Sequence, residues 1–229
     1  MAKKKTASRA KIRVDKAEAA NRVKKIIPVL RKEYPDARVA LKHRNPLELL
    51  VATILSAQCT DVRVNMVTKD LFRKYKSAAD WASVDLGQLE SEIRSTGFYH
   101  NKALSIKSSC SEINERFGGE VPSTIDELVS LRGVGRKTAN VVLGGAFDQP
   151  AITCDTHVIR LSRRLGLSPN SDPVKLEFDL ADIVAKKDWM LFSNLLIFHG
   201  RNICKARNPD CGNCLISKHC PAANNTALW

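Results

Sequence analysis

Apolar residues recur along this chain every three or four positions, which is the spacing of one helix face. Residues 16–33 show the pattern clearly, with an apolar face formed by Ala19, Val23, Ile26, Ile27 and Leu30. Pro28 falls inside this segment, and because a proline removes a helical hydrogen bond it predicts a kink. The pattern therefore predicts a long amphipathic helix near the start of the chain.

Capping residues mark where further helices begin. Asn45 and Pro46 supply a cap and a first helical position for residues 47–55, and Thr60 with Asp61 can start the next helix. Periodicity predicts more helices near residues 86–94, 102–117, 124–131, 137–147, 156–165, 174–184 and 188–199. Because the chain shows no convincing period-two alternation, no repeat and no low-complexity linker, the predicted fold class is all-α.

The chain has 229 residues, enough for one large domain or two small lobes. No run of residues reaches the roughly 20 uninterrupted apolar positions that a membrane helix needs. The start of the chain is polar and rich in lysine, without an apolar signal region. These features predict a globular protein with no membrane partner that stays in a reducing, cytoplasmic compartment.

Basic residues outnumber acidic ones, and the formal net charge is +13. Many of the cations lie at the start of the chain: Lys3, Lys4, Lys5, Arg9, Lys11, Arg13, Lys16, Arg22, Lys24 and Lys25. Such an excess favours a polyanionic partner, because phosphate contacts release counterions. A solvated tail that only aids solubility explains the same charge, so both interpretations stay open at this point.

Four of the seven cysteines cluster near the end of the chain, with the spacing Cys204-x6-Cys211-x2-Cys214-x5-Cys220. Thiolates are soft ligands that suit zinc or iron–sulfur clusters, and four of them make a closed site. The paired C-x2-C motifs of many zinc sites are absent, which favours iron and leaves zinc open. The other three cysteines, Cys59, Cys110 and Cys154, are scattered and are expected to be small buried side chains.

Cations surround the cysteine cluster in the sequence, at Arg201, Lys205, Arg207 and Lys218. On a loop held by a metal centre they would form a surface for phosphate groups. Ordinary solvation of a surface loop is an equally good explanation of these cations taken alone.

A glycine turn lies between two predicted helices, in the sequence Leu131-Arg-Gly-Val-Gly-Arg-Lys-Thr-Ala-Asn140. Gly133 and Gly135 permit a tight turn and a close backbone approach to a ligand. The following helix presents free N–H groups and a positive dipole end, which suit a DNA phosphate. The segment predicts a helix-hairpin-helix, although an ordinary corner between helices would look similar.

Lys137 falls in the first turn of that second helix, where the dipole and Arg136 disfavour another positive charge. A neutral lysine amine is a nucleophile for a sugar C1′ carbon, through a Schiff base. Asp155 could accept the proton of such an amine and stabilise positive charge on a sugar, or it could simply cap the helix that begins at Thr156. The sequence alone does not place the two residues together.

Taken jointly, these motifs resemble the endonuclease III family of DNA-repair enzymes. The resemblance covers nearly the whole chain after the N-terminal tail. It depends on Ser56-Ala57-Gln58, the glycine turn from Gly133 to Asn140, Asp155-Thr156-His157, His199-Gly200-Arg201 and the cysteine spacing, all in this order.

The resemblance implies two helical lobes with a DNA cleft between them. One lobe, residues 40–150, would be a six-helix barrel with the helix-hairpin-helix at about 125–144. Residues 16–39 and 151–229 would form the lobe around a [4Fe–4S] cluster, and residues 1–15 a flexible basic tail. The implied protein is a monomer associated with the nucleoid of a bacterial-type cell.

The implied activity is that of a bifunctional DNA N-glycosylase and abasic-site lyase, acting on duplex DNA with oxidised pyrimidines or abasic sites. Lys137 matches the nucleophile of the family, Asp155 its catalytic carboxylate, and the four clustered cysteines the cluster ligands. The implied DNA contacts are Gln58, Phe98, Gly133, Gly135, Arg136, His157, Arg201, Lys205 and Arg207. Of these, Gln58 would fill the gap left by the flipped base, and Phe98 would be an apolar wedge.

Three residues depart from the pattern of the family. Arg132 stands where proline is common, and Cys59 and Cys154 replace small apolar residues beside Gln58 and Asp155. None of them removes a catalytic group, so they bear on substrate range and turnover.

Alternative functions also fit parts of this sequence. An adenine-mismatch glycosylase of the same superfamily would share the hairpin and cluster, but usually lacks the hairpin lysine and carries an extra recognition domain. A non-catalytic DNA-binding protein that senses redox state would need neither Lys137 nor Asp155. A ferredoxin-type electron carrier fits poorly with a large helical chain of strong positive charge.

Overall fold

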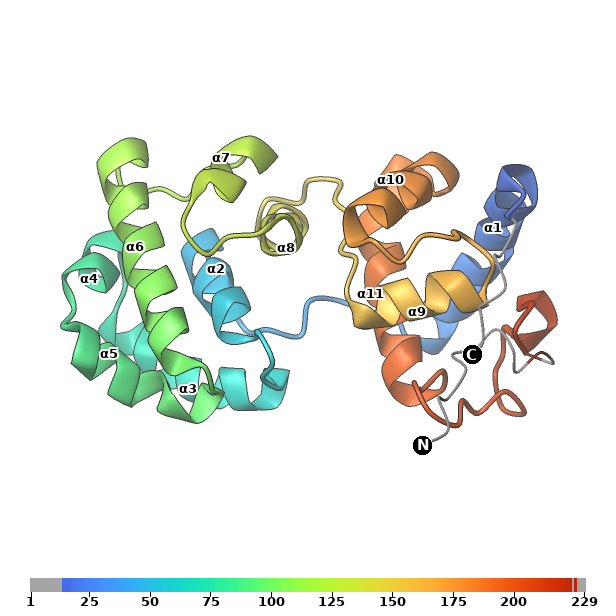
Figure 1. Cartoon of the computed structure of the whole chain (residues 1–229), viewed down its shortest axis with the longest axis horizontal. Coiled ribbons are helices and arrows are strands. Elements are labelled where there is room, and N and C mark those ends of the chain that lie inside the picture. The colour runs from blue at the N-terminus through green and yellow to red at the C-terminus, as the bar shows by residue number, and fades with distance from the viewer. Residues whose placement is uncertain (1–13, 224, 226–229) are drawn as a thin grey trace, which may run out of the picture. The chain divides into compact units, whose positions relative to one another are not determined.

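The computed structural model describes residues 14–223 and residue 225, and every regular element in that part of the chain is a helix (Figure 1). The all-α prediction is confirmed. The expected tail, residues 1–15, lies outside the described residues apart from Val14 and Asp15. No helix within the described part is long and apolar enough to cross a lipid bilayer.

Two compact units make up the chain. One is the continuous segment Arg38–Ala151, and the other combines the described residues of Met1–Ala37 and of Ile152–Trp229. The chain therefore leaves the second unit after α1 and returns to it before α9. The barrel arrangement and the roles of the two lobes stay predictions.

The unit Arg38–Ala151 is built around one buried helix, α2, which packs against α3, α6 and α8. Asn45 caps α2 by accepting a hydrogen bond from the Glu48 N–H at 2.9 Å, as its position before Pro46 predicts. The elements of this unit are α2 (Pro46–Leu55), α3 (Asp61–Lys74), α4 (Ala78–Ser83), α5 (Leu86–Ile93), the 3-10 turn η1 (Arg94–Thr96), α6 (Tyr99–Phe117), α7 (Ile125–Ser130) and α8 (Arg136–Ala146).

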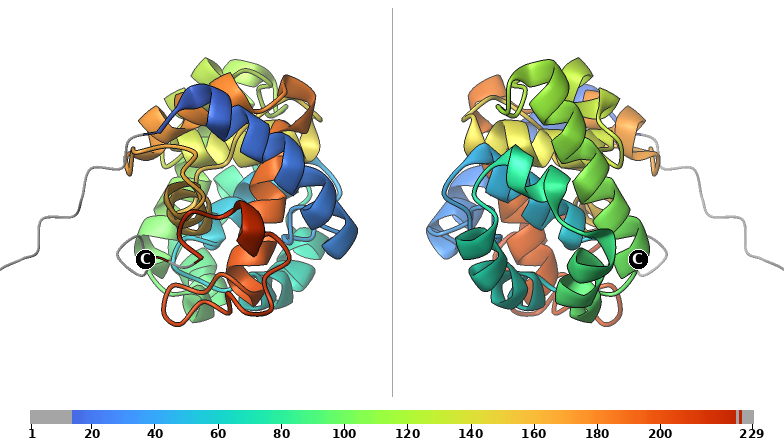
Figure 2. Two further views of the ribbon diagram at one scale, coloured as in Figure 1. Left: turned by 90° about the vertical axis from the view of Figure 1, so that its right-hand side faces the viewer. Right: turned by 90° about the vertical axis from the view of Figure 1, so that its left-hand side faces the viewer.

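The other unit joins the two ends of the described chain through one core. The apolar face of α1 packs on α10 and α11 (Figure 2), and the helix continues through Pro28 to Glu33. Burying such a face is what stabilises an amphipathic helix, since propensity alone contributes little. Its elements are α1 (Lys16–Glu33), α9 (Thr156–Arg164), α10 (Pro173–Ile183), the 3-10 turn η2 (Lys186–Asp188), α11 (Trp189–Asn202) and the 3-10 turn η3 (Ser217–His219).

The structure contains one α-helix that was not predicted, and it shows that the predicted burial of one cysteine, Cys59, was wrong. Helix α4 begins with a reciprocal capping box, in which Ser77 Oγ accepts from the Asp80 N–H and Asp80 Oδ2 accepts from the Ser77 N–H. Cys110 and Cys154 are buried as predicted, whereas Cys59 is only half-buried. Cys59 follows the end of α2, where the chain turns outward toward α3.

Candidate active site and cluster loop

The glycine turn joins α7 to α8 and forms the predicted helix-hairpin-helix. Gly133 adopts a φ of 79°, and a Cβ built on it would lie 2.5 Å from the side chain of Ser105 on α6. Gly135 has an ordinary φ of −84° and open space where a Cβ would point. Gly133 is therefore required by the fold, while Gly135 leaves the N-terminus of α8 accessible to a ligand.

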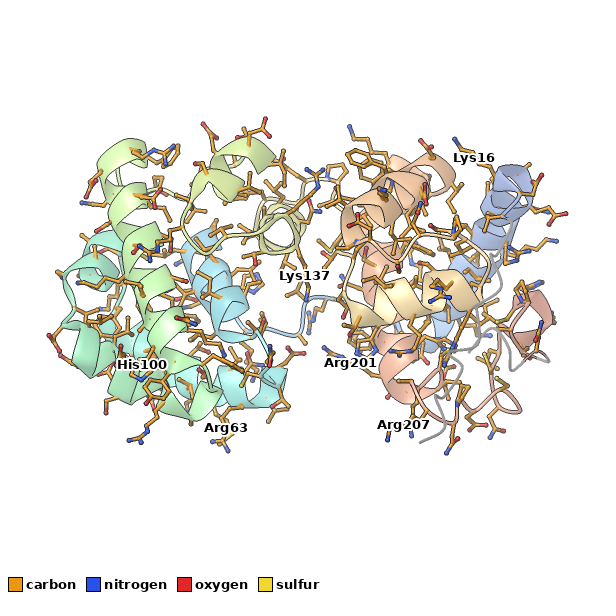
Figure 3. All side chains as sticks on the ribbon, viewed as in Figure 1. Lys16, Arg63, His100, Lys137, Arg201 and Arg207 are labelled. Atoms are coloured by element: carbon orange, nitrogen blue, oxygen red, sulfur yellow. The ribbon has the colours of Figure 1, made fainter. Side chains whose placement is uncertain are left out.

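Lys137 lies in the first turn of α8, and its side chain is exposed (Figure 3). Among the described residues, no hydrogen bond or ion pair engages its amine. The first turn of a helix disfavours a cation electrostatically, and no carboxylate of the described chain compensates Lys137 there. A lysine that contributes nothing to local structure is available for chemistry.

Asp155 caps α9. Its Oδ1 accepts hydrogen bonds from the backbone N–H groups of His157 and Val158, both at 2.8 Å. The segment before it is held in place because the Thr153 N–H donates to Ser193 Oγ on α11, at 3.0 Å. Within the described chain the second carboxylate oxygen, Oδ2, makes no hydrogen bond, so one oxygen orients the group and the other is free to act.

Lys137 belongs to the unit Arg38–Ala151, and Asp155 to the unit that contains the cysteine cluster. The structure thus describes each residue within its own unit, and their pairing stays a prediction.

Gln58 and Phe98 share an unusual backbone conformation. Their φ values are 53° and 49°, in the left-handed region that side chains with a Cβ adopt rarely. Phe98 is 61 % exposed, contrary to the core position that its apolar side chain alone would suggest. Both residues line one pocket together with Gly133 and Thr138 of the hairpin.

The four clustered cysteines line one cavity between α9, α11 and the C-terminal loop. In the described residues no three His, Cys, Asp or Glu side chains converge on a single ion position. A lone zinc ion needs its thiolates that close together, whereas a polynuclear cluster takes one thiolate per iron around a larger volume. Four thiolates around one cavity are a ligand set that suits an iron–sulfur cluster.

Hydrogen-bond donors face the cysteine sulfurs. Arg164 Nη1 lies 3.3 Å from the sulfur of Cys204, and backbone N–H groups reach those of Cys214 and Cys220. Such donors stabilise thiolate ligands and tune an anionic cluster. Burial raises the pKa of the Cys214 thiol to about 11.

Two arginines of α9 that are not among the sequence-predicted site residues hold the start of the cluster loop, which is the segment 203–223 after α11 that carries the clustered cysteines. Arg160 Nη2 donates to the carbonyls of Gly200 and Cys204, at 3.0 and 2.9 Å. Arg164, buried in this unit, donates to the Lys205 carbonyl at 2.7 Å. Their i, i+4 spacing on α9 was the available signal, because it places both on one side of the helix.

The segment His199-Gly200-Arg201 allows α9 and α11 to pack closely. A Cβ on Gly200 would meet His157 Nδ1 at 2.8 Å. Burial lowers the pKa of His157, and Arg160 and Arg201 act in the same direction, against the effect of Asp155. Arg160 Nη2 lies 3.1 Å from His157 Nδ1, and the ring also interacts with the Gly200 backbone, so His157 is held between α9 and α11.

Exposed cations lie along the loop that α9 holds. Arg201 lies in the last turn of α11, and Arg207 follows in the loop, both labelled in Figure 3, with Lys205 between them in the sequence. All three side chains are exposed, as a phosphate-binding surface requires.

Comparison with known proteins defines the class to which this fold and site belong. Residues 51–186 match the family of HhH-GPD superfamily base excision DNA repair proteins, and residues 204–220 match the iron-sulfur binding domain of endonuclease III. The chain is thus a helix-hairpin-helix protein of base excision repair with an iron–sulfur domain.

Curated relatives and solved structures narrow this class. The chain is 50 % identical to endonuclease III of Synechocystis over 208 residues, which cover 90 % of this chain and 95 % of the relative. It is 38 % identical to endonuclease III of Escherichia coli over 195 residues, covering 85 % and 92 %. A solved non-covalent endonuclease III–DNA complex superposes with a TM-score of 0.84 at 45 % identity, over 89 % of this chain and 96 % of that one.

This chain belongs to the endonuclease III family. It is a DNA glycosylase and abasic-site lyase of base excision repair that carries a [4Fe–4S] cluster.

Proposed function

We propose that this protein excises oxidised pyrimidines from duplex DNA and cuts the strand 3′ to the lesion, with Lys137 as the nucleophile and Asp155 as the catalytic carboxylate. The exposed Lys137 amine, in the first turn of the second hairpin helix, carries the proposal, since the described chain gives it no structural partner. The DNA in the solved complexes of relatives supports DNA as the substrate.

The chemistry follows from the two side chains. The neutral Lys137 amine attacks C1′ of the damaged nucleotide, and the C1′–N bond breaks as its electron pair leaves with the base, which takes up a proton. Asp155 accepts the ammonium proton and stabilises the positive charge of the sugar. The C1′–O4′ bond then breaks, O4′ takes up a proton, and a Schiff base forms between C1′ and the Lys137 nitrogen. The Schiff base acidifies C2′–H, and β-elimination breaks the C3′–O bond and releases the downstream strand with a 5′-phosphate. Both units must contact the same nucleotide for this sequence of steps.

The described surface supports a division of labour among DNA contacts. The N–H groups at Gly133, Gly135 and Arg136 would bind a backbone phosphate. Arg201, Lys205, Arg207 and His157 would contact further phosphates. Gln58 would fill the gap left by the flipped base, and Phe98 would wedge between its neighbours, because both are exposed beside the hairpin.

We further propose that Cys204, Cys211, Cys214 and Cys220 each ligate one iron of the cluster. A four-thiolate site leaves no open position for substrate, so its contribution is to hold the basic loop in place. We place the protein in the cytoplasm at the nucleoid, as a monomer.

Borohydride trapping tests the proposed nucleophile. The protein is incubated with duplex DNA containing thymine glycol or an abasic site, and borohydride then reduces any Schiff base to a stable adduct. We expect an adduct with the native protein and none with Lys137→Gln. Lys69→Gln is the matched control, because Lys69 is another exposed lysine of the same unit.

An adduct retained in Lys137→Gln would assign the nucleophile elsewhere. DNA binding without any adduct or strand cleavage, by folded and cluster-loaded protein, would contradict the proposed chemistry and favour the non-catalytic alternative. Excision of adenine from mismatches would favour the other glycosylase class.

A further inference from the structure

A buried lysine that the proposed reaction does not use lies beneath the pocket of Gln58 and Phe98. Lys102, in the first turn of α6, is 4 % exposed and lines that pocket from below the surface. Burial lowers the pKa of its ammonium group, as expected for a cation removed from water. A charged group in this position needs compensation that an apolar side chain would not need.

Two backbone carbonyls supply that compensation. Lys102 Nζ donates to the carbonyl oxygens of Leu55 and Thr96, both at 2.8 Å. Leu55 is the last residue of α2 and Thr96 the last of η1. Carbonyls at helix ends have no intrahelical partner and carry negative partial charge, so an ammonium group is a fitting donor for them.

The two clamped ends lead directly into the two exposed, strained residues. Three residues after Leu55 the chain reaches Gln58, and two residues after Thr96 it reaches Phe98. The left-handed backbone at each residue is strained for a side chain with a Cβ, and it persists only where the surroundings fix it. The backbone N–H of Lys102 also donates to the Phe98 carbonyl, at 3.1 Å, so the lysine engages the second loop twice.

We propose that Lys102 is a positioning residue that fixes the Gln58 and Phe98 loops to one another, so that both side chains enter the DNA in register when the damaged base leaves the stack. The inference rests on the proposed roles of Gln58 and Phe98 in duplex DNA. It assigns Lys102 to base extrusion and leaves the Schiff-base chemistry at Lys137 independent of it.

The same helix offers a matched control. Lys107 Nζ also donates to two backbone carbonyls, those of Ala82 and, at 2.7 Å, Val84. These carbonyls lie at the end of α4, and Lys107 does not line the pocket of Gln58 and Phe98. Loss of either lysine removes a clamp of the same kind, but only Lys102 acts on the inserting loops.

The experiment compares Lys102→Met and Lys107→Met on two substrates under single-turnover conditions. Excision of thymine glycol from duplex DNA requires base extrusion, whereas borohydride trapping on a single-stranded abasic site requires only Lys137. We expect Lys102→Met to slow duplex excision at least tenfold while the single-strand trapping rate stays within about twofold. Lys107→Met should leave the ratio of the two rates unchanged.

A double-mutant cycle links the effect to the loops. In a Gln58→Ala, Phe98→Ala background, Lys102→Met should cause no further fall in the ratio, because the residues it positions are gone. Equal slowing on both substrates, or the same ratio for both lysine variants, would overturn the proposal. If Lys102→Met does not fold, Lys102→Gln is judged by the same ratio, and native protein inactive on both substrates would instead contradict the proposed function.

Discussion

Asp155 caps α9 with one oxygen, so its capping role and its proposed catalytic role can be separated by substitution. Asp155→Asn keeps an acceptor for the N–H groups of His157 and Val158 but removes the charge. We expect its melting temperature to stay close to that of the native protein while base excision falls about 10²–10⁴-fold.

Asp155→Ala should lose the cap as well, at a cost of about 1 kcal/mol in unfolding free energy. Asp172 is the matched control, since it caps α10 in the same unit by accepting from the Lys175 N–H at 2.8 Å. Asp172→Ala should show the same loss of stability with normal excision. Native-like excision by Asp155→Asn, measured in single turnover, would reduce Asp155 to a cap.

The cysteines outside the cluster differ in reactivity. Burial raises the pKa of Cys110 and of Cys154 to about 12, so both stay protonated at pH 8, where a thiolate is needed for alkylation. Cys59 is half-buried and accessible. In cluster-loaded protein, iodoacetamide followed by peptide mass spectrometry should label Cys59 well before the other two. Equal labelling rates in folded protein would contradict the buried positions of Cys110 and Cys154.

At the scale of elements, the two hairpin glycines should respond differently to alanine. Gly133→Ala places a Cβ on a φ of 79° and against Ser105, so we expect a loss of roughly 2–4 kcal/mol in unfolding free energy. Gly135→Ala meets open space and should cost less than about 1 kcal/mol.

In DNA affinity, by contrast, we expect the larger effect from Gly135→Ala. Gly135→Ala adds a methyl group where the phosphate would approach, so we expect weaker binding of an abasic-site duplex by a protein of near-native melting temperature. Urea unfolding and fluorescence anisotropy measure the two quantities. Unchanged affinity in Gly135→Ala would remove this turn from the DNA interface.

Helices with a long apolar face and a clear cap were predictable from the sequence. Residues 16–33 match α1, and Thr60 caps α3 as expected. Helix α4 was not predicted, because six residues are too few to show a helical period. Its capping box of Ser77 and Asp80 was the signal in the sequence. Local chemistry suggested a nucleophile at Lys137 and either a proton acceptor or a cap at Asp155, and the resemblance added the catalytic roles. Lys102 and Arg164 were not predictable, because they donate to carbonyls 47 and 41 residues away in the sequence.

At the scale of the whole molecule, the discontinuous unit was not predictable from composition, because no linker marks either crossing. Tertiary packing decides it, since the buried face of α1 finds its partners only in α10 and α11. Because the clustered cysteines belong to this discontinuous unit, loss of the cluster is expected to affect mainly that unit.

Removing the cluster by oxidation should destabilise the unit that contains the clustered cysteines and leave the unit Arg38–Ala151 almost unchanged. The hydrogen bonds that hold the cluster loop run to Arg160 and Arg164 of α9 and to the end of α11. We expect faster amide hydrogen exchange in residues 199–223 and in α9, with little change in α2–α8. Cluster-loaded protein kept anaerobic is the control, and uniform acceleration across both units would show that the cluster stabilises the whole chain.

The chain returns to the unit that contains α1 only after residue 151, and this has a consequence for protein synthesis. Helix α1 leaves the ribosome early, but α10 and α11 emerge more than a hundred residues later, on the order of ten seconds at typical translation rates. The segment Arg38–Ala151 can fold during that interval, while the apolar face of α1 waits uncovered. The core of this unit, and the cavity that Cys220 lines, can therefore be completed only when synthesis of the chain is nearly finished.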